Sequence, residues 1–356
     1  MTRTSSLVVD RTHLGRRASG IERITEELFS DEALAPLRVS GMHSGGQGKW
    51  AVAASQMMAI PLAMARRPDT VWAFSGFPPS PLATMFRERC VMYVHDLFLI
   101  TRKQDLNRAA RIYMAPPFRL AIRQLRYFLV NSLATAEALA PYLRPDAVVL
   151  PYRPKVRNVF DLRPSEGRPG DADPLILGAI GTVEPRKNLL AAAAIALELG
   201  RVAGREVRLH VIGRAGWGED FAALSRMPHV TLHGFLGEDD ARAAIANFDL
   251  LVCTSHDEGL GLPLIEAQYA GLQVVAPDKP VFREVLASSG LYIDPDDVPG
   301  AARTLAARLR ESDWRGRSAI AARENIARWN ILADFDRSAV VDFLSERLTD
   351  RAGRCK

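Results

Sequence analysis

Apolar residues in the second half of the chain occur in short runs separated by segments with helical spacing. Runs such as Leu175–Ile180 and Val207–Ile212 are mostly apolar, which is typical of strands buried on both faces of a parallel sheet. This alternation predicts a doubly wound, mainly parallel α/β sheet. Its other strands are expected at Val230–Leu232, Leu250–Cys253, Gln273–Ala276 and Leu291–Ile293, and its helices at Leu189–Val202, Asp239–Asn247 and Pro263–Ala270.

The first half shows a similar but less regular pattern, and we expect a second α/β domain there. Its strands are predicted at Leu7–Val9, Thr70–Phe74, Cys90–Val94 and Phe128–Val130, and a helix at Gly20–Phe29. The apolar segment Ala51–Ala65 is shorter than the roughly 20 residues that a membrane-spanning helix needs. We therefore expect it to be a core helix.

Changes in composition suggest where the domains end. The stretch 163–174 is rich in proline, glycine and charge and has no apolar period, as is typical of a linker. The tail 324–348 carries apolar residues at near-helical spacing. We therefore predict a first domain over 1–163, a linker over 164–174, a second domain over 175–325 and a C-terminal helix over 326–356.

Composition indicates a globular protein in a reducing compartment. The 356 residues are 48% hydrophobic and 24% charged, and three cysteines without a CxxC pair argue against disulfides and zinc. The first apolar run is too short for a signal peptide, so we expect a cytoplasmic protein.

The net charge of +5 is unevenly distributed. Residues 102–126 contain seven basic residues and one acid among interleaved apolar residues. Such a segment can lie on an anionic membrane surface, or it can be a solvated helix pair broken at Pro116 and Pro117. No recognition motif accompanies the charge, so nucleic acid is not an expected partner.

The segment Ser255–Ala267 combines two glutamates, two glycines and a helix-starting proline directly after an apolar run. Backbone N–H groups at a helix N-terminus can bind an anion, and glycines allow it to approach the backbone. Glu258 and Glu266 can both face one crevice, where carboxylates accept hydrogen bonds from sugar or ribose hydroxyls. This pattern predicts a phosphate and sugar site.

Two adjacent cations, Arg186 and Lys187, occur in the segment 181–188, which follows the first strand of the second domain. A guanidinium offers a bidentate fork and an ammonium a point charge, and together they suit a diphosphate whose negative charge grows as it leaves.

These two segments resemble the donor site of the family 4 retaining glycosyltransferases of GT-B fold, the glycosyl transferases group 1. The resemblance implies two facing Rossmann-like domains and a C-terminal helix that crosses back to the first. It implies that Glu258 contacts the sugar hydroxyls, Glu266 the ribose, and Arg186 and Lys187 the diphosphate. Some relatives have an arginine at the position of Thr182. Further donor-site positions by this resemblance are Thr182, Gly213, Gly259, Gly261 and Leu262.

In the first domain, His95 and Asp96 follow an apolar strand. The family often has a histidine at this strand end, and the resemblance implies that His95 contacts the transferred sugar, whereas Asp96 can orient the loop. Gly20 belongs to a glycine-containing loop that in relatives lies beside the donor or acceptor. Asn131 and Ser132 resemble a helix cap.

The resemblance implies transfer of a hexose from a nucleotide diphosphate sugar to a hydroxyl acceptor with retention, and without a metal or further cofactor. The segment Glu184–Asn188 looks most like mannosyltransferase members, which favours mannose from GDP-mannose. Expected acceptors are lipid-linked or surface polysaccharide intermediates at the cytoplasmic face of the membrane. Four alternatives remain open: a retaining glycosidase, a GT-B nucleotide-sugar epimerase, an inactive membrane-associated scaffold, and a metal-dependent GT-A enzyme using Asp294 and Asp296.

Overall fold

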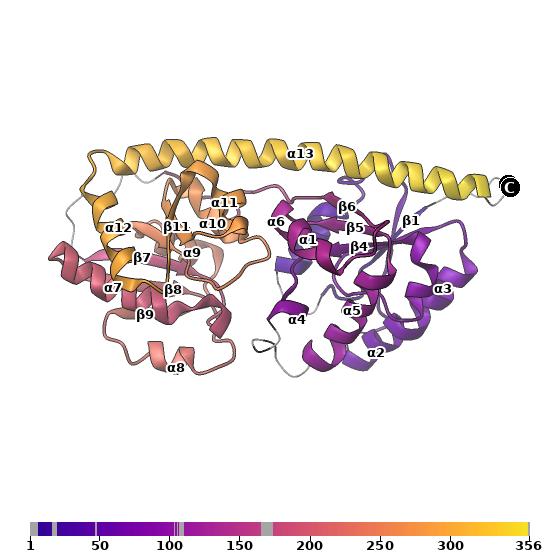
Figure 1. Ribbon diagram of the computed structural model, residues 1–356, viewed down its shortest axis with the longest axis horizontal. Helices are drawn as coiled ribbons and strands as arrows, with labels where there is room; N and C mark the ends of the chain where they lie inside the picture. Colours follow the sequence, from indigo (N-terminus) through magenta and orange to yellow (C-terminus); the bar gives the residue numbers. More distant parts are fainter. Residues whose placement is uncertain are drawn as a thin grey trace. The chain divides into compact units, whose positions relative to one another are not determined.

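A computed structural model describes residues 6–15, 20–46, 48–102, 104, 106, 110–164 and 174–354. The chain forms two units (Figure 1): unit 1 is Met1–Lys155 with Leu332–Lys356, and unit 2 is Val156–Ile331. Each unit is built on its own six-stranded sheet, which confirms the two predicted α/β domains. Within the described ranges, no helix combines the length and hydropathy needed to cross a lipid bilayer.

The sheet of unit 1 is parallel throughout and has the strand order β2-β1-β3-β4-β5-β6. Its first strand pairs with both the second and the third. The strand order therefore switches at β1 and β3: the chain adds β2 on one side of β1 and all later strands on the other side. Ligands bind beyond the carboxyl ends of parallel strands at such a switch point. The strands are β1 (Leu7–Asp10), β2 (Val39–Met42), β3 (Val71–Phe74), β4 (Cys90–Val94), β5 (Tyr127–Val130) and β6 (Val148–Pro151).

One helical layer covers one face of this sheet. Ile60, Met64, Phe118 and Ile122 from its helices pack against Trp72 and other strand side chains in a single core cluster. In Figure 1, α2, α3 and α5 lie below the strands of unit 1. The layer consists of α2 (Lys49–Ala54), η1 (Ser55–Ala59), α3 (Ile60–Arg66), η2 (Ala83–Arg89), α4 (Phe98–Thr101), η4 (Ala110–Met114), α5 (Ala115–Gln124), α6 (Leu133–Leu139) and η5 (Ala140–Tyr142).

The opposite face of the unit 1 sheet packs against α1 (Gly20–Leu28) and the C-terminal part of α13 (Trp314–Arg354). Phe29, directly after α1, contacts the ring of Tyr93 edge to face at 5.7 Å, and Phe343 of α13 contacts Tyr127 at 5.5 Å. Aromatic pairs in this geometry add to the stabilisation from burial.

The sheet of unit 2 is also parallel and has the order β12-β11-β10-β7-β8-β9. Its first strand is therefore central, and the switch point lies between β7 and β10. The strands are β7 (Leu175–Ile180), β8 (Val207–Ile212), β9 (Val230–Gly234), β10 (Leu250–Val252), β11 (Gln273–Pro277) and β12 (Gly290–Ile293).

Helices cover both faces of the unit 2 sheet. Apolar residues of α7 and α12, such as Ile195 and Leu305, share a core cluster with Leu177 and Leu209 of the strands. On the other face, Gly178 of β7 leaves room for the ring of Phe248, since a Cβ there would lie 1.9 Å from that ring. The helices are η6 (Pro185–Lys187), α7 (Leu189–Ala203), α8 (Asp220–Leu224), α9 (Glu238–Ile245), α10 (Leu262–Ala267), η7 (Gln268–Ala270), α11 (Pro280–Leu286), η8 (Ala287–Ser289) and α12 (Val298–Arg310).

The boundary between the units differs from the predicted one. The chain passes from unit 1 to unit 2 between Lys155 and Val156, not near 163. The reason is that Val156 is tied to unit 2: its N–H donates to Asn330 (2.8 Å) and its carbonyl accepts from the Tyr269 hydroxyl (3.1 Å). Most of the predicted linker, residues 165–173, lies outside the described residues.

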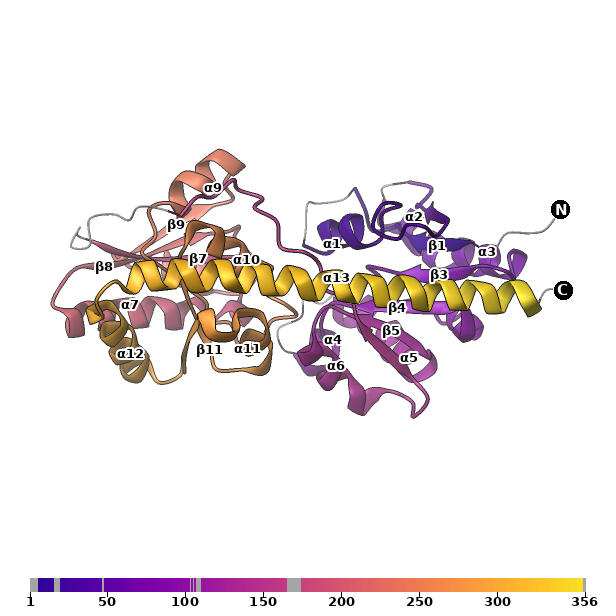
Figure 2. The ribbon, with the colours of Figure 1, turned by 90° about the horizontal axis from the view of Figure 1, so that it is seen from above.

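The C-terminal helix is longer than predicted. It begins at Trp314 rather than at 326, and its residues belong to unit 2 as far as Ile331 and to unit 1 from Leu332. Figure 2 shows α13 as one continuous helix. Its first turn contains Gly316, a residue with low helix propensity that conceals the start of a helix in the sequence.

The prediction that Ala51–Ala65 is a core helix is only half right. The segment is helical as α2, η1 and α3, and Ile60 and Met64 are wholly buried. However, Met58 and Leu62 on the same helix are 71% and 49% exposed. The apolar composition predicted a core helix, yet only one side of this helix meets the sheet.

Candidate active site

The carboxyl ends of β7 and β10 lie side by side because the two strands pair directly. After β7 the chain turns through η6, and Asn188 adopts a left-handed conformation (φ 50°) before α7 begins. After β10 it forms the loop 253–261, where Gly261 (φ 80°) precedes α10. Two loops far apart in the sequence are thereby brought to the switch point of the sheet, where ligands of such folds bind.

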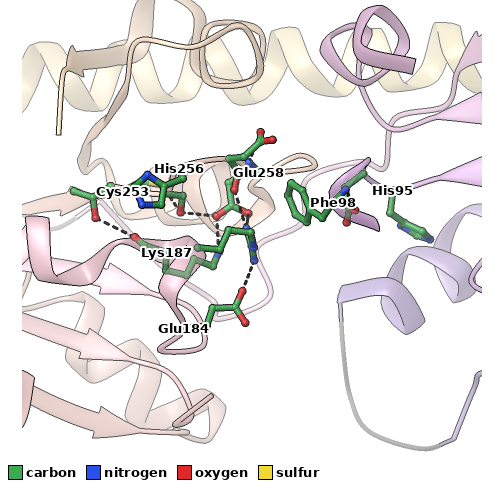
Figure 3. A network of polar contacts seen from close by, with 12 residues as sticks. His95, Phe98, Glu184, Lys187, Cys253, His256 and Glu258 are labelled. Atoms are coloured by element: carbon green, nitrogen blue, oxygen red, sulfur yellow. Dashed lines mark hydrogen bonds and ion pairs between the residues drawn. The ribbon is translucent and has the colours of Figure 1, made fainter. Parts of the chain in front are cut away.

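Glu258 accepts charge-assisted hydrogen bonds from both predicted cations (Figure 3). The ammonium of Lys187 lies 2.6 Å from Glu258 Oε1, and Arg186 Nη1 lies 2.9 Å from Oε2. The Ser255 hydroxyl also donates to Oε1 at 2.6 Å. On its other side, Arg186 binds Glu184 Oε1 at 2.7 Å. The four charged side chains are between 7% and 18% exposed, so this network is shielded from water.

The electrostatics of this network favour ionised groups. Burial by itself would raise the pKa of Glu258, but the nearby charges of Lys187 and Arg186 outweigh it and lower the pKa to about 2. Burial opposes the charge of Arg186, and the carboxylates Glu258 and Glu184 more than compensate, raising the pKa of Arg186. Glu258 is thus a carboxylate at neutral pH and cannot donate a proton there.

Backbone contacts hold the two loops together. The N–H of His256 donates to the carbonyl of Arg186 at 2.9 Å, and Arg186 Nη1 donates to the carbonyl of Asp257 at 2.8 Å. The Thr254 hydroxyl lies 2.8 Å from the carbonyl of Asn188, and Lys279 donates to the carbonyl of His256. Hydrogen bonds to backbone groups therefore position the loops that carry Arg186 and Lys187, in addition to the ion pairs with Glu258.

A small pocket at this edge of the sheet brings together three of the residues predicted for the donor site. Lys187, Glu258 and Gly261 line it, along with Gly181 and Ser255. Gly181 has φ 143°, and a Cβ there would lie 3.2 Å from Lys187, so glycine gives the lysine side chain room.

The other predicted donor-site residues are near this edge but do not line that pocket within the described chain. Glu266 is 4% exposed in α10, close enough to Tyr269 to raise the pKa of that phenol together with burial. Leu262, the first residue of α10, is 7% exposed. Gly213 packs against the backbone of Gly181, since a Cβ would lie 1.8 Å from its carbonyl oxygen. Thr182 and Gly259 are half-buried in the two loops.

Sequence reasoning missed Glu184 and Ser255 as members of the network. Glu184 is 5% exposed and is the second counterion of Arg186. Its position directly before Pro185 in the predicted cation segment was the available signal. Asp294 and Asp296, considered as a metal-binding pair, form a turn after β12 in which the Asp296 N–H donates to Asp294 Oδ1 at 3.0 Å.

In unit 1, His95 lies at the end of β4 and points toward the end of β3. Its Nε2 lies 2.7 Å from the carbonyl oxygen of Ser75, which can only accept, so Nε2 carries the proton. The Thr25 hydroxyl donates to the same carbonyl at 3.4 Å and lies 3.0 Å from His13 Nε2. His95 Nδ1 is buried without a hydrogen-bond partner among the described residues. Burial lowers the pKa of His95 to about 4 and outweighs the hydrogen bond to the Ser75 carbonyl, which by itself would raise it, so the ring is neutral at pH 7.

The remaining first-domain predictions have mixed outcomes. Asp96 Oδ1 accepts from the N–H of Phe98 at 2.9 Å, which confirms that it orients the loop at the start of α4. Ser132 caps α6 by accepting from the N–H of Thr135 at 3.0 Å, as predicted. Gly20 is the exposed first residue of α1, and residues 16–19 of its loop lie outside the described chain.

The basic segment 102–126 is not an amphipathic membrane surface along its whole length. Residues 103, 105 and 107–109 lie outside the described chain. In α5, Phe118 and Ile122 are 4% and 1% exposed and belong to the core of unit 1. Only Ile112 and Tyr113 of the predicted apolar residues are strongly exposed, at 62% and 75%.

Comparison with known proteins confirms the resemblance. Residues 174–311 match the family described as glycosyl transferases group 1. The chain is 31% identical over 155 residues to the serotype-specific mannosyltransferase WbdA of Escherichia coli, covering 39% of this chain and 19% of WbdA. It is 31% identical over 203 residues to the phosphatidyl-myo-inositol mannosyltransferase of Mycolicibacterium smegmatis, covering 54% of this chain and 50% of that protein. The chain thus spans half or less of the length of these two relatives.

Solved structures show that the fold is GT-B. Anabaena HepE in complex with UDP and glucose superposes with a TM-score of 0.67 at 15% identity, covering 96% of this chain and 100% of HepE. WaaG, a glycosyltransferase involved in lipopolysaccharide biosynthesis, superposes with a TM-score of 0.63 at 16% identity, covering 95% and 99%. Part of the second unit, residues 174–311, therefore matches the glycosyl transferases group 1 family, and the fold is GT-B.

Proposed function

We propose that this chain, whose residues 174–311 match the glycosyl transferases group 1 family, is a glycosyltransferase that moves a hexose from a nucleoside diphosphate sugar to a hydroxyl acceptor. The observation that carries the proposal is the network in which Arg186 and Lys187 hold Glu258 at the switch point of unit 2. It provides two fixed cations for a diphosphate and an ionised carboxylate for sugar hydroxyls.

The two cations supply the electrostatic part of catalysis in this proposal. Negative charge accumulates on the diphosphate as the glycosidic bond breaks, and positioned cations stabilise that charge without reorganisation. The helix α10 has only six residues, so few aligned peptide dipoles assist them. Because Arg186 and Lys187 can neutralise the leaving group, we propose a reaction that needs no metal.

Sugar recognition is assigned to Glu258 and His95. The Glu258 carboxylate accepts hydrogen bonds from sugar hydroxyls. The neutral ring of His95 keeps its Nδ1 lone pair for another hydroxyl, since Nε2 is committed to the Ser75 carbonyl. Glu266 is assigned to the ribose. We further propose transfer with retention at the anomeric carbon, in which the leaving phosphate assists deprotonation of the acceptor.

Mannose from GDP-mannose is the proposed donor, because two matched relatives are mannosyltransferases. The proposed acceptor is a lipid-linked or surface polysaccharide intermediate at the inner face of the cytoplasmic membrane. The relatives' names support this class: one acts in serotype-specific mannosylation and another on phosphatidyl-myo-inositol.

Thermal unfolding in the presence of GDP, UDP, dTDP and their sugar conjugates tests the donor. A ligand at about a hundredfold excess over its Kd stabilises the folded state by about 2.7 kcal/mol. We expect GDP and GDP-mannose to raise the Tm selectively, and Glu258→Ala to abolish mannosyl transfer to an acceptor. Stabilisation by UDP alone would mean that the donor is a UDP-sugar and not GDP-mannose. Conversion of the sugar nucleotide without acceptor would identify an epimerase, and no response to any nucleotide would favour the inactive scaffold.

A further inference from the structure

The helix formed by α2, η1 and α3 has apolar side chains on both its buried and its exposed side. Val52, Ile60 and Met64 face the core of unit 1 and are 5% exposed or less. On the outer side, Trp50 is 87% and Met58 71% exposed. A surface helix of a globular domain normally carries polar residues on its outer side, so this exposed stripe is anomalous.

The exposed apolar surface continues onto the next element of the same layer. The helix η2 packs beside α3, and its Met85 is 76% exposed. The buried guanidinium of Arg89 fixes the two elements to each other by donating to the carbonyls of Met64 (2.9 Å) and Arg67 (2.7 Å). The surface is therefore a defined feature of unit 1.

Positive charge predominates around this surface. The segments 49–67, 82–89 and 110–124, which cover the helices α2, η1, α3, η2, η4 and α5, contain eight lysines and arginines and one acid, Glu88. Two further acids lie beside these segments in the layer: Asp69, two residues after Arg67, and Glu137 in α6. Glu88 is paired with Arg126 at 3.6 Å. Arg66 and Arg67 are exposed at the end of the apolar stripe. By comparison, the whole chain has 46 basic and 41 acidic residues, so the excess here is local.

We propose that this apolar–cationic surface, defined by Trp50, Met58, Leu62, Met85, Arg66 and Arg67, binds anionic phospholipid bilayers. A bilayer of this kind offers phosphates to the arginines and an apolar interior to Trp50 and Met58. Tryptophan suits the boundary between the two, because its ring is amphipathic. The excess of cations favours an anionic partner over a second copy of this chain, because two copies would bring like charges together. This inference does not depend on the proposed enzymatic activity.

Co-sedimentation of the full chain with vesicles tests the proposal. We expect binding to vesicles of phosphatidylcholine mixed with phosphatidylglycerol, and much weaker binding to phosphatidylcholine alone. The double variant Trp50→Ser/Met58→Ser should lower the partition coefficient by about tenfold or more. The double variant Ile331→Ser/Phe335→Ser is the matched control, because these α13 side chains are 57% and 69% exposed, and it should bind like the unaltered chain.

Tryptophan fluorescence locates the contact. Lipids brominated in their acyl chains should quench emission from Trp50, and Trp50→Phe should remove that quenching while most of the binding remains. Trp217→Phe in unit 2 should retain the quenching. The double variant Arg66→Ser/Arg67→Ser should weaken binding to anionic vesicles by about fivefold per cation removed.

Three results would overturn the proposal. One is equal vesicle binding by the Trp50→Ser/Met58→Ser variant and the unaltered chain when both show the same Tm. Another is binding that does not depend on anionic lipid. The third is self-association of the unaltered chain, lost in that double variant and unaffected by vesicles, which would make the surface an interface between copies.

Discussion

Lys187 and Glu258 lie 71 residues apart in the sequence and form an ion pair of 2.6 Å. One closes the turn after β7 and the other lies on the loop after β10, and these strands are neighbours in the sheet. The predicted phosphate-binding cations and the predicted sugar-binding carboxylate are therefore parts of one network. A diphosphate that binds the cations must compete with Glu258, so donor binding and the orientation of this carboxylate are coupled.

The substitution Glu258→Gln should lower both stability and activity. It keeps the size of the side chain but leaves Arg186 and Lys187 without one of their counterions in a shielded site. Removing one member of a buried pair typically costs about 3–5 kcal/mol, and loss of a catalytic electrostatic contact lowers kcat by about a hundredfold or more. Denaturant unfolding and a transfer assay measure the two effects.

Glu206→Gln is the control for that variant. Glu206 forms a 2.6 Å ion pair with Arg208, but the side chains are 55% and 47% exposed. Exposed pairs contribute about 0–1 kcal/mol, so stability and kcat should barely change. A Glu258→Gln protein as stable as the Glu206→Gln protein would mean that water already screens the site network.

The network should also make stability depend on acid pH. The folded pKa of Glu258 is about 2, below its ordinary value of 4.5, so its contribution is complete above about pH 4.5 and is lost as pH falls toward 2. The shift corresponds to about 3 kcal/mol. The free energy of unfolding of the unaltered chain minus that of Glu258→Gln should shrink over this window. A difference that stays constant between pH 5 and pH 2 would contradict the assignment.

His95 should remain neutral, with its proton on Nε2, far below the usual titration range of histidine. Burial lowers its pKa to about 4, and the Ser75 carbonyl selects the Nε2–H form. Nitrogen NMR of labelled protein should show this tautomer from pH 8 to about pH 5, with assignment by His95→Gln. The neutral ring contributes stability above about pH 6.5 that is lost as the pH falls toward 4. Protonation near pH 6.5 would refute the assignment.

Gly213→Ala should disturb the donor site by displacing backbone. A Cβ at this position would lie 1.8 Å from the carbonyl oxygen of Gly181, and that residue begins the loop carrying Lys187. We expect a loss of about 1–3 kcal/mol from overpacking and a higher KM for the donor. Gly237→Ala is the control, since its φ is −67° and nothing lies within 4 Å. Unchanged donor KM in Gly213→Ala would show that the loop tolerates displacement.

Asp336→Ala should destabilise unit 1 by about 3–5 kcal/mol. Asp336 in α13 accepts from the guanidinium of Arg153 at 2.7 Å and from its N–H at 3.1 Å, and both side chains are at most 8% exposed. Asp334→Ala, two residues away, removes an exposed pair with Lys155 and should cost less than about 1 kcal/mol. Chemical denaturation compares them, and equal losses would mean that the buried pair contributes nothing beyond an exposed one.

Local pattern was enough to predict most of the buried strands. Leu175–Ile180, Val207–Ile212 and Cys90–Val94 have the predicted bounds, because strands covered on both faces must be apolar along their length. The edge strands β2 and β6 were missed, since their residues are only half-buried or exposed and carry a weaker pattern. The segment Ala51–Ala65 was predicted to be a core helix, and its exposed side was missed because the sequence does not show which elements cover a helix.

The sequence by itself determined the alternation of strands and helices and the chemistry of the two donor motifs, since both depend on residues close together in the chain. Only the tertiary structure decided that Glu258 is the counterion of Arg186 and Lys187, that Glu184 and Ser255 complete the network, and that Trp50 and Met58 face outward. These relationships depend on strand order and on layer packing, which join residues far apart in the chain. No local pattern records which strand lies beside which.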